Sequence, residues 1–196
     1  MRQPLPPRAS LGWGGVYDGI VTTSILTARL ELRPITLPIV EAVLRGDRAE
    51  VEAIAGARIP EAWPGPALIE RAFSASLEAI RADPVTRLWG DRLMITRTAD
   101  PRVLGSVVFH GKPDSDGICE VGYGVEESSQ RQGYATESVL AAVDWAMAQP
   151  EVRAVQATTL GWHRPSVRVL EKIGMHQCGT RDHDLLGELL VYERRK

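Results

Sequence analysis

The spacing of apolar residues changes between residues 117 and 146, and this change constrains the fold more than any other feature. Residues 117–125 alternate in polarity as a strand does. Helical spacing begins just after Gly133 and links Ala135, Val139, Ala142, Val143 and Ala146. We therefore predict a strand, a loop over residues 126–135 and a helix, at the centre of a mixed α/β sheet.

Further strands and helices flank this unit, so the fold class is α/β (α+β). The patterns predict strands at 27–33, 88–98, 102–110 and 152–160, and a closing antiparallel pair at 175–182 and 185–193. They predict helices at 38–45, 47–55, 67–82 and 165–173, with Asp47 as an N-cap, Pro84 as a helix stop and Gly174 as the glycine that follows the last helix.

The composition is that of one globular domain. The chain has 196 residues, of which 44% are hydrophobic and 24% are charged. We predict a single domain over 23–196, preceded by a flexible Pro- and Gly-rich arm over 1–22. The net charge of −2 and the lack of a long apolar run favour neither a nucleic-acid partner nor a membrane span. Cys119 and Cys178 are spaced for neither zinc nor a disulfide framework, so we expect a cytoplasmic protein with reduced thiols and no metal.

The loop at 126–135 has the features of an anion site. A helix entered from a strand leaves backbone N–H groups unpaired at its N-terminus, and the helix dipole favours a phosphate there. Gly133 lets a ligand approach the backbone, Ala135 adds little obstruction, and Arg131 and Gln130 add charge and hydrogen bonds at the rim. The alternative is an exposed strand-to-helix turn that binds nothing.

Three segments, in order, carry a resemblance to a known family. Gln130-Arg131-Gln132-Gly133-Tyr134-Ala135 resembles the Gln/Arg-x-x-Gly-x-Gly/Ala signature of the GNAT superfamily of N-acetyltransferases. Glu120-Val121-Gly122-Tyr123 and the segment 166–175 resemble the ribosomal-protein (RimJ/RimL-like) branch. The resemblance implies a mostly antiparallel sheet of about six or seven strands, and a loop that holds the pyrophosphate of acetyl-CoA. The cofactor contacts that we expect are Gly124, Val125, Gln130, Arg131, Gln132, Gly133, Tyr134, Ala135, Thr136, His163 and Ser166.

Two residues are candidates for catalysis. Glu120 lies on the central strand, where burial would raise its pKa toward that of a general base for the amine. The alternative is a strand-edge glutamate paired with an arginine. Ser166 matches the family serine, which implies that it donates to the cofactor sulfur or protonates the thiolate; alternatively it is an ordinary residue at a helix N-terminus. No tyrosine lies between Tyr134 and Tyr192, so we leave the role of a tyrosine acid vacant.

The surroundings of these residues yield three further expectations. The resemblance implies that strand 117–125 splays from strand 152–160, which makes N–H groups around Gly124 and Val125 the oxyanion donors, with a bulge near Gly122 or Gly124. His163 replaces the usual family asparagine, and we expect it to cap the helix or contact the cofactor. Trp63 and Glu61, on a rigid connector, are candidates for the acceptor site; core packing and an exposed carboxylate are the alternatives.

We therefore predict transfer of an acetyl group from acetyl-CoA to a primary amine, by direct attack in a ternary complex. The acceptor is a protein N-terminus or a small-molecule amine, and the sequence leaves open whether the chain forms a homodimer. One alternative is a non-catalytic acyl-CoA-binding module, which the His163 departure and the missing tyrosine keep open. Another is an enzyme that binds a nucleotide phosphate.

Overall fold

The structure, a computed structural model, describes residues 23–61 and 77–196. The arm predicted at 1–22 and most of the helix predicted at 67–82 lie outside these residues. The strands are β1 Ile25–Leu26, β2 Leu30–Pro34, β3 Arg92–Thr96, β4 Val103–Phe109, β5 Ile118–Val125, β6 Ala154–Leu160, β7 His176–His183 and β8 Gly187–Arg195. The helices are α1 Leu37–Arg45, α2 Arg48–Ala55, α4 Leu77–Ala82, α5 Pro84–Arg87, α6 Tyr134–Met147 and α7 Arg164–Lys172, with a 3-10 turn, η3, at Glu127–Ser129.

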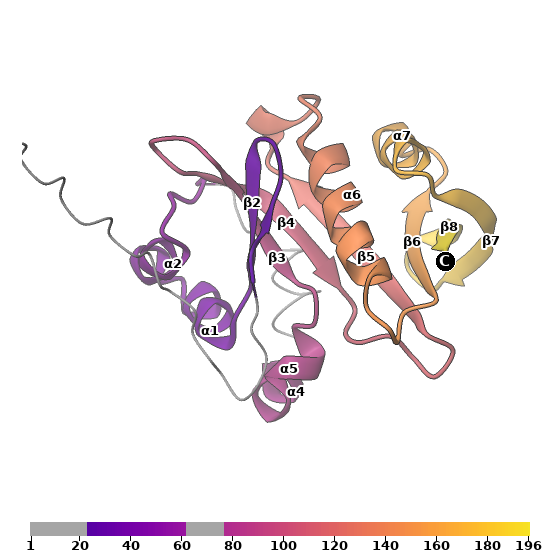
Figure 1. The fold of residues 1–196 in the computed structure, drawn as a ribbon, viewed down its shortest axis with the longest axis horizontal. Helices are drawn as coiled ribbons and strands as arrows, with labels where there is room; N and C mark the ends of the chain where they lie inside the picture. Colours follow the sequence, from indigo (N-terminus) through magenta and orange to yellow (C-terminus); the bar gives the residue numbers. More distant parts are fainter. Residues whose placement is uncertain (1–22, 62–76) are drawn as a thin grey trace, which may run out of the picture.

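Within the described residues, eight strands form one sheet in the order β1-β2-β3-β4-β5-β6-β8-β7 (Figure 1). Neighbouring strands are antiparallel except β5 and β6, which are parallel. The predicted mixed, mostly antiparallel sheet is confirmed. It has one strand more than expected because β1, with 2 residues, is too short to carry a readable alternation.

Helices cover both faces of the sheet. Helices α6 and α7 pack on one face, over a core that includes Val121, Val139 and Leu170. Helices α1, α2 and α4 pack on the other, over a core that includes Ile39 and Val108. We call these the α6 face and the α1 face; in Figure 1, α6 lies in front of β5.

Alternation along β5 assigns its side chains to these two faces. Val121 belongs to the core on the α6 face, and Tyr123 packs against the same core. Gly122 pairs with Val108, a core residue of the α1 face. Glu120 and Gly122 therefore lie on the α1 face, whereas Tyr123 lies on the α6 face.

Most predicted boundaries agree with the structure, and the exceptions have local causes. Asp47 caps α2 by accepting the N–H of Glu50 at 3.0 Å, and Gly174 follows α7 with φ 78°. The strand predicted at 88–98 begins only at Arg92. Residues 88–91 instead form the turn that follows α5, and α5 forms because Asp83 accepts the N–H of Thr86 and proline is compatible with the first turn of a helix.

The bulge expected near Gly122 or Gly124 is absent from β5 as described. The register between β4 and β5 runs without a shift from Gly105–Val125 to Phe109–Val121. Register shifts occur instead between β7 and β8, at Gln177/Gly179, and between β3 and β4, at Met94/Ile95. Gly105 sits beside the second of these shifts, where a Cβ would lie only 2.0 Å from the carbonyl oxygen of Gly124. Because Gly105 has no Cβ, it does not clash with Gly124, and β5 stays regular beside it.

Among the described residues, no helix has the length and apolar character needed to cross a bilayer.

Candidate functional site

Strands β5 and β6 pair along only part of their length. Their parallel ladder joins Ile118 to Ala154 and ends where Glu120 meets Gln156. Beyond that point β5 continues on β4 to Val125, and β6 continues on β8 to Leu160. The splay expected from the resemblance is therefore confirmed. We call the region between Val121–Val125 and Ala157–Leu160 the split.

The N–H groups of β5 alternate between the two sides of the strand. Glu126 donates its N–H to Leu104 of β4 at 2.8 Å, and His110 donates to the carbonyl oxygen of Glu120 at 3.0 Å, so even-numbered residues bond β4. Gly124 is thereby directed toward β4, and the expectation that its N–H serves as an oxyanion donor is corrected. The N–H groups of Tyr123 and Val125 point toward the split, so Val125 stays a predicted donor.

The loop between β5 and α6 is braced by its own side chains. Gln130 donates its amide to the carbonyl oxygen of Val125 at 3.0 Å, and Gln132 donates to that of Ser128 at 3.1 Å. Arg131 has φ 59°, the left-handed region, and its side chain is exposed. The two glutamines therefore shape the loop, while Arg131 is free to meet an anion at its rim.

The N-terminus of α6 presents backbone donors as the sequence predicts. Gly133 is the N-cap, with φ 85° and ψ 0°. The first bond of the helix runs from Glu137 N–H to the carbonyl oxygen of Gly133, at 3.0 Å. The N–H groups of Tyr134, Ala135 and Thr136 precede that bond, so they are available to a ligand. This arrangement suits a phosphate, because donors and helix dipole act together.

Arg29 is a functional candidate that the sequence analysis missed. It lies in the turn between β1 and β2, and its guanidinium sits 4.3 Å from the centroid of the Tyr134 ring. Its Nε donates to Glu137 at 2.7 Å and its Nη1 donates to the carbonyl oxygen of Gln132 at 3.0 Å. Its Nη2 lies 3.4 Å from the place that a Cβ on Gly133 would take. The positively charged Arg29 side chain, from the turn between β1 and β2, thus lies beside the N-terminus of α6.

Glu137 anchors Arg29 from within the helix. Burial acts to raise the pKa of Glu137, but hydrogen bonds from the Thr27 hydroxyl and from the N–H and guanidinium of Arg29 outweigh it and lower the pKa. The carboxylate is therefore charged at neutral pH and holds Arg29 in place.

Both oxygens of the Glu120 carboxylate have hydrogen-bond partners. Its Oε1 accepts from the Thr158 hydroxyl at 2.9 Å, and its Oε2 accepts from Arg181 at 2.8 Å. Burial acts to raise the pKa of Glu120, but the bonds from Arg181 and Thr158 prevail and lower it. The expected rise in pKa is wrong, and the alternative of pairing with an arginine is confirmed. A role for Glu120 in catalysis stays a prediction.

Ser166 is the third residue of α7, and a tyrosine meets it across the split. The hydroxyl of Tyr123 lies 2.9 Å from Ser166 Oγ and 3.3 Å from the Ser166 carbonyl oxygen. Burial raises the pKa of Tyr123, although its bond with Ser166 acts against the rise. The resemblance alone leaves this tyrosine unassigned, because Tyr123 precedes the interval between Tyr134 and Tyr192 in which a tyrosine acid is expected. The alternation of β5, which turns Tyr123 toward the helices of the α6 face, could have found this one.

His163 occupies the N-cap position of α7, but its imidazole makes no capping hydrogen bond. The ring is exposed and lies edge-on to Trp162, with 6.0 Å between the ring centroids. The prediction of side-chain capping is therefore wrong, whereas contact with the cofactor stays a prediction.

The two acceptor-site candidates are only partly placed. Glu61 is exposed at the end of the segment 23–61, and Trp63 lies outside the described residues. Their role stays a prediction.

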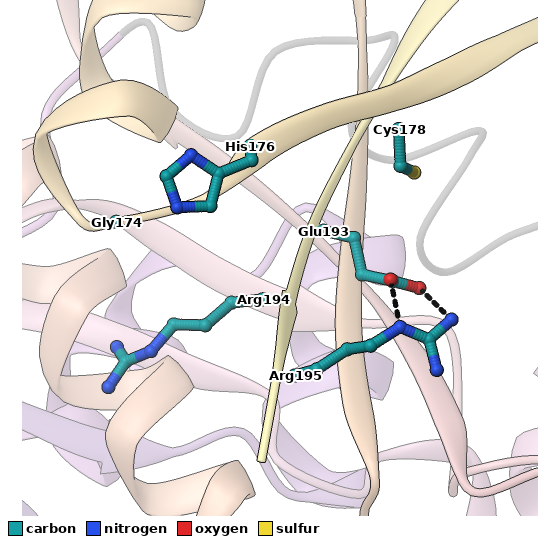
Figure 2. A pocket seen from close by; sticks show the side chains of 6 residues that line it. All are labelled: Gly174, His176, Cys178, Glu193, Arg194 and Arg195. Atoms are coloured by element: carbon teal, nitrogen blue, oxygen red, sulfur yellow. Dashed lines mark hydrogen bonds and ion pairs between the residues drawn. The ribbon is translucent and has the colours of Figure 1, made fainter.

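A hollow on β7 and β8 contains none of the predicted site residues. It is lined by Gly174, His176, Cys178, Glu193, Arg194 and Arg195. Figure 2 shows the Arg195 guanidinium turned onto the Glu193 carboxylate, which also accepts from Gln156 at 2.9 Å. Its charged groups are thus partly neutralised by one another.

Both cysteines are free thiols, as expected. Cys119 is buried beside the start of the split, and burial raises its pKa to about 12. A thiolate is the nucleophilic form of cysteine. Cys119 is therefore unsuited to accept an acetyl group at neutral pH.

Comparison with known proteins agrees with this geometry. Residues 29–176 match the family model described as "Acetyltransferase (GNAT) domain". The chain is 26% identical over 148 residues to YjdG, an uncharacterized N-acetyltransferase of Bacillus subtilis, with 76% of this chain and 86% of that protein covered.

Solved structures share the fold. A RimL ribosomal L7/L12 alpha-N-protein acetyltransferase in complex with coenzyme A superposes with a TM-score of 0.61 at 16% identity, covering 88% of this chain and 98% of the other. The ribosomal-protein-S5-alanine acetyltransferase of Vibrio fischeri gives 0.59 at 15% identity, covering 88% and 96%.

These matches give no support to the non-catalytic or nucleotide-phosphate alternatives. The family match spans the split, the loop before α6 and the Tyr123–Ser166 contact. The chain therefore belongs to the GNAT acetyltransferase family, and it transfers an acetyl group from acetyl-CoA to an amine.

Proposed function

We propose that the acceptor is the α-amino group of a peptide or protein N-terminus. The observation that carries this proposal is the state of Glu120. Its carboxylate is held by Thr158 and Arg181, and its pKa is lowered. A carboxylate with a low pKa is a weak base, and the charge of this one is already balanced by Arg181, so the site favours an amine that is neutral near pH 7.

An α-amine suits such a site better than a lysine side chain does. The pKa of a free α-amine is about 7.7–8.0 and that of a lysine amine about 10.4, so only the former is substantially neutral near pH 7. Its nitrogen can attack after it loses a proton to water near Glu120. The ribosomal-protein acetyltransferases of the same fold support the same acceptor class.

The residues of the α6 face hold the donor in this proposal. The N–H groups of Tyr134, Ala135 and Thr136 bind the pyrophosphate of acetyl-CoA, and Arg131 and Arg29 supply positive charge beside it. The N–H of Val125 faces the thioester oxygen in the split. The Ser166 hydroxyl donates to the sulfur as it leaves.

The test compares acceptors, and the rate of acetyl transfer to each is measured by the release of the free coenzyme A thiol. The panel contains a peptide with a free N-terminus, the same peptide N-terminally blocked with one internal lysine, a polyamine and an aminoglycoside. We expect the free N-terminus to give the highest kcat/KM near neutral pH and the blocked peptide to give almost none. A preference for the lysine or for either small amine would refute the proposed acceptor.

The pH profile tests the role given to Glu120. If Glu120 stays ionised, the ascending limb of kcat/KM reports the amine of the acceptor, with an apparent pKa of about 7.7–8.0. Changing the acceptor for one with a lower amine pKa should shift that limb down by the same amount. If the apparent pKa of the ascending limb does not change with the acceptor, the titrating group belongs to the enzyme and not to the amine.

A further inference from the structure

The Tyr123–Ser166 contact joins the two sides of the split. Tyr123 comes from β5 and Ser166 from the first turn of α7, and 43 residues separate them in the chain. Tyr123 lies three residues beyond Glu120, where the ladder between β5 and β6 has already ended. The hydroxyl pair therefore lies where the sheet opens, on the α6 face that also carries the loop before α6.

The direction of the hydrogen bond between Tyr123 and Ser166 determines whether the Ser166 hydroxyl can donate to a ligand. A serine hydroxyl has one hydrogen and can accept from two donors. If Ser166 donates to Tyr123, no serine hydrogen remains for a ligand. If Tyr123 donates to Ser166, the serine hydrogen is free and turns away from the tyrosine. The two oxygens are 2.9 Å apart, a full hydrogen bond in either direction.

The surroundings of Tyr123 favour the second arrangement. The phenol is partly buried, and this burial raises its pKa, so it retains its proton at neutral pH. The carbonyl oxygen of Ser166, at 3.3 Å, lies farther from the phenol than Oγ does. A carbonyl oxygen inside α7 can also accept a helical N–H group, whereas the bond with Tyr123 is the one that the described residues give to Ser166 Oγ.

We propose that Tyr123 is a positioning residue, which donates to Ser166 Oγ and thereby directs the serine hydrogen at the sulfur of acetyl-CoA. This inference rests on the role proposed for Ser166. In the reaction the amine nitrogen bonds to the acetyl carbon, the carbon–sulfur bond breaks, and its electron pair stays on sulfur. Ser166 stabilises that charge by hydrogen bonding, and the sulfur takes up the proton that the amine releases through water, so the pair ends with both its protons.

The test is Tyr123→Phe in the full chain, with steady-state kinetics for acetyl-CoA. We expect kcat to fall about 10-fold, equivalent to ~1.4 kcal/mol, while KM for acetyl-CoA stays within about twofold. A merely structural tie would instead alter KM or the melting temperature. Tyr192→Phe is the matched control, since Tyr192 is a buried tyrosine of the same core, on β8, and that variant should keep the wild-type kcat.

A double-variant cycle separates this inference from the role of Ser166. Ser166→Ala should lower kcat, and adding Tyr123→Phe to it should lower kcat by less than about twofold more, because the tyrosine acts only through the serine. Ser166→Thr keeps the hydroxyl, and Tyr123→Phe should again cost about 10-fold in that background.

The outcomes are distinguishable. A fully active Ser166→Ala variant overturns the proposed role of Ser166 and this inference with it. If Ser166→Ala has a lowered kcat and Tyr123→Phe keeps the wild-type kcat, the inference about Tyr123 is overturned and the role of Ser166 stands. The same holds if adding Tyr123→Phe to Ser166→Ala lowers kcat by a further 10-fold. Should Tyr123→Phe fold poorly, the ratio of Ser166→Thr to Ser166→Ala activity decides: equal kcat values contradict a directed hydroxyl.

Discussion

A single methyl group at Gly133 tests the anion site most directly. Gly133 has φ 85° and ψ 0° at the N-cap of α6. An L-residue in the left-handed region costs roughly 1–2 kcal/mol. For a chain of this length that lowers the melting temperature by about 2–8 °C, at roughly 2–4 °C for each kcal/mol. Gly133→Ala therefore destabilises the fold even without a ligand.

The same methyl group should also weaken coenzyme A binding. The added Cβ lies 3.4 Å from Arg29 Nη2, on the side where the guanidinium meets the start of α6. A pyrophosphate bound between them loses one or two charge-assisted hydrogen bonds, each worth about 1.5–3 kcal/mol. We expect the dissociation constant for coenzyme A to rise at least about 10-fold, measured by titration calorimetry.

Gly174→Ala is the control that separates strain from obstruction. Gly174 has φ 78°, and nothing lies within 4 Å of the place its Cβ would take. It follows the end of α7 that is remote from Ser166. Both variants should lose similar stability in a thermal melt, and only Gly133→Ala should lose affinity. Equal dissociation constants for the two variants would refute the site at the N-terminus of α6.

Two further substitutions probe the charged side chains. Arg29→Met removes the bonds to Glu137 and Gln132, and calorimetry should show coenzyme A binding weakened by about 3- to 10-fold, less at high salt; unchanged affinity would exclude Arg29 from the site. The lowered pKa of Glu120 means that its carboxylate adds stability above the ordinary value of 4.5 and loses it as the pH falls through the folded pKa. Glu120→Gln should therefore melt lower than the wild type at pH 7, with the gap closing in acid; a gap that is constant with pH would contradict the ion pair.

Local patterns were sufficient to predict the central unit. The alternation over 117–125 gave β5 and the helical spacing gave α6, because each reports one buried face of a regular element. The position of Gly133 was predicted for the same reason, since it separates the two periods. The loop's likeness to a known signature then supplied the ligand class.

The residues that the sequence did not reveal act through long-range contacts. Arg29 reaches Glu137 across 108 residues, and Arg181 reaches Glu120 across 61. Exposed arginines carry no periodic signal, so nothing local indicates which carboxylate each will meet. The error in the pKa of Glu120 has this origin: burial was predictable from the strand, whereas the arginine that outweighs it was not.

Neighbouring side chains of β5 point to opposite sides of the sheet, and this has a consequence for how such a chain can change. Tyr123 and Glu120 lie on opposite faces of β5; in the function proposed above, the first face binds acetyl-CoA and the amine approaches from the second. Replacing residues on the α1 face leaves the α6 face undisturbed, because the backbone of β5 separates the two. Specificity for one reactant can therefore drift in evolution while recognition of the other is conserved.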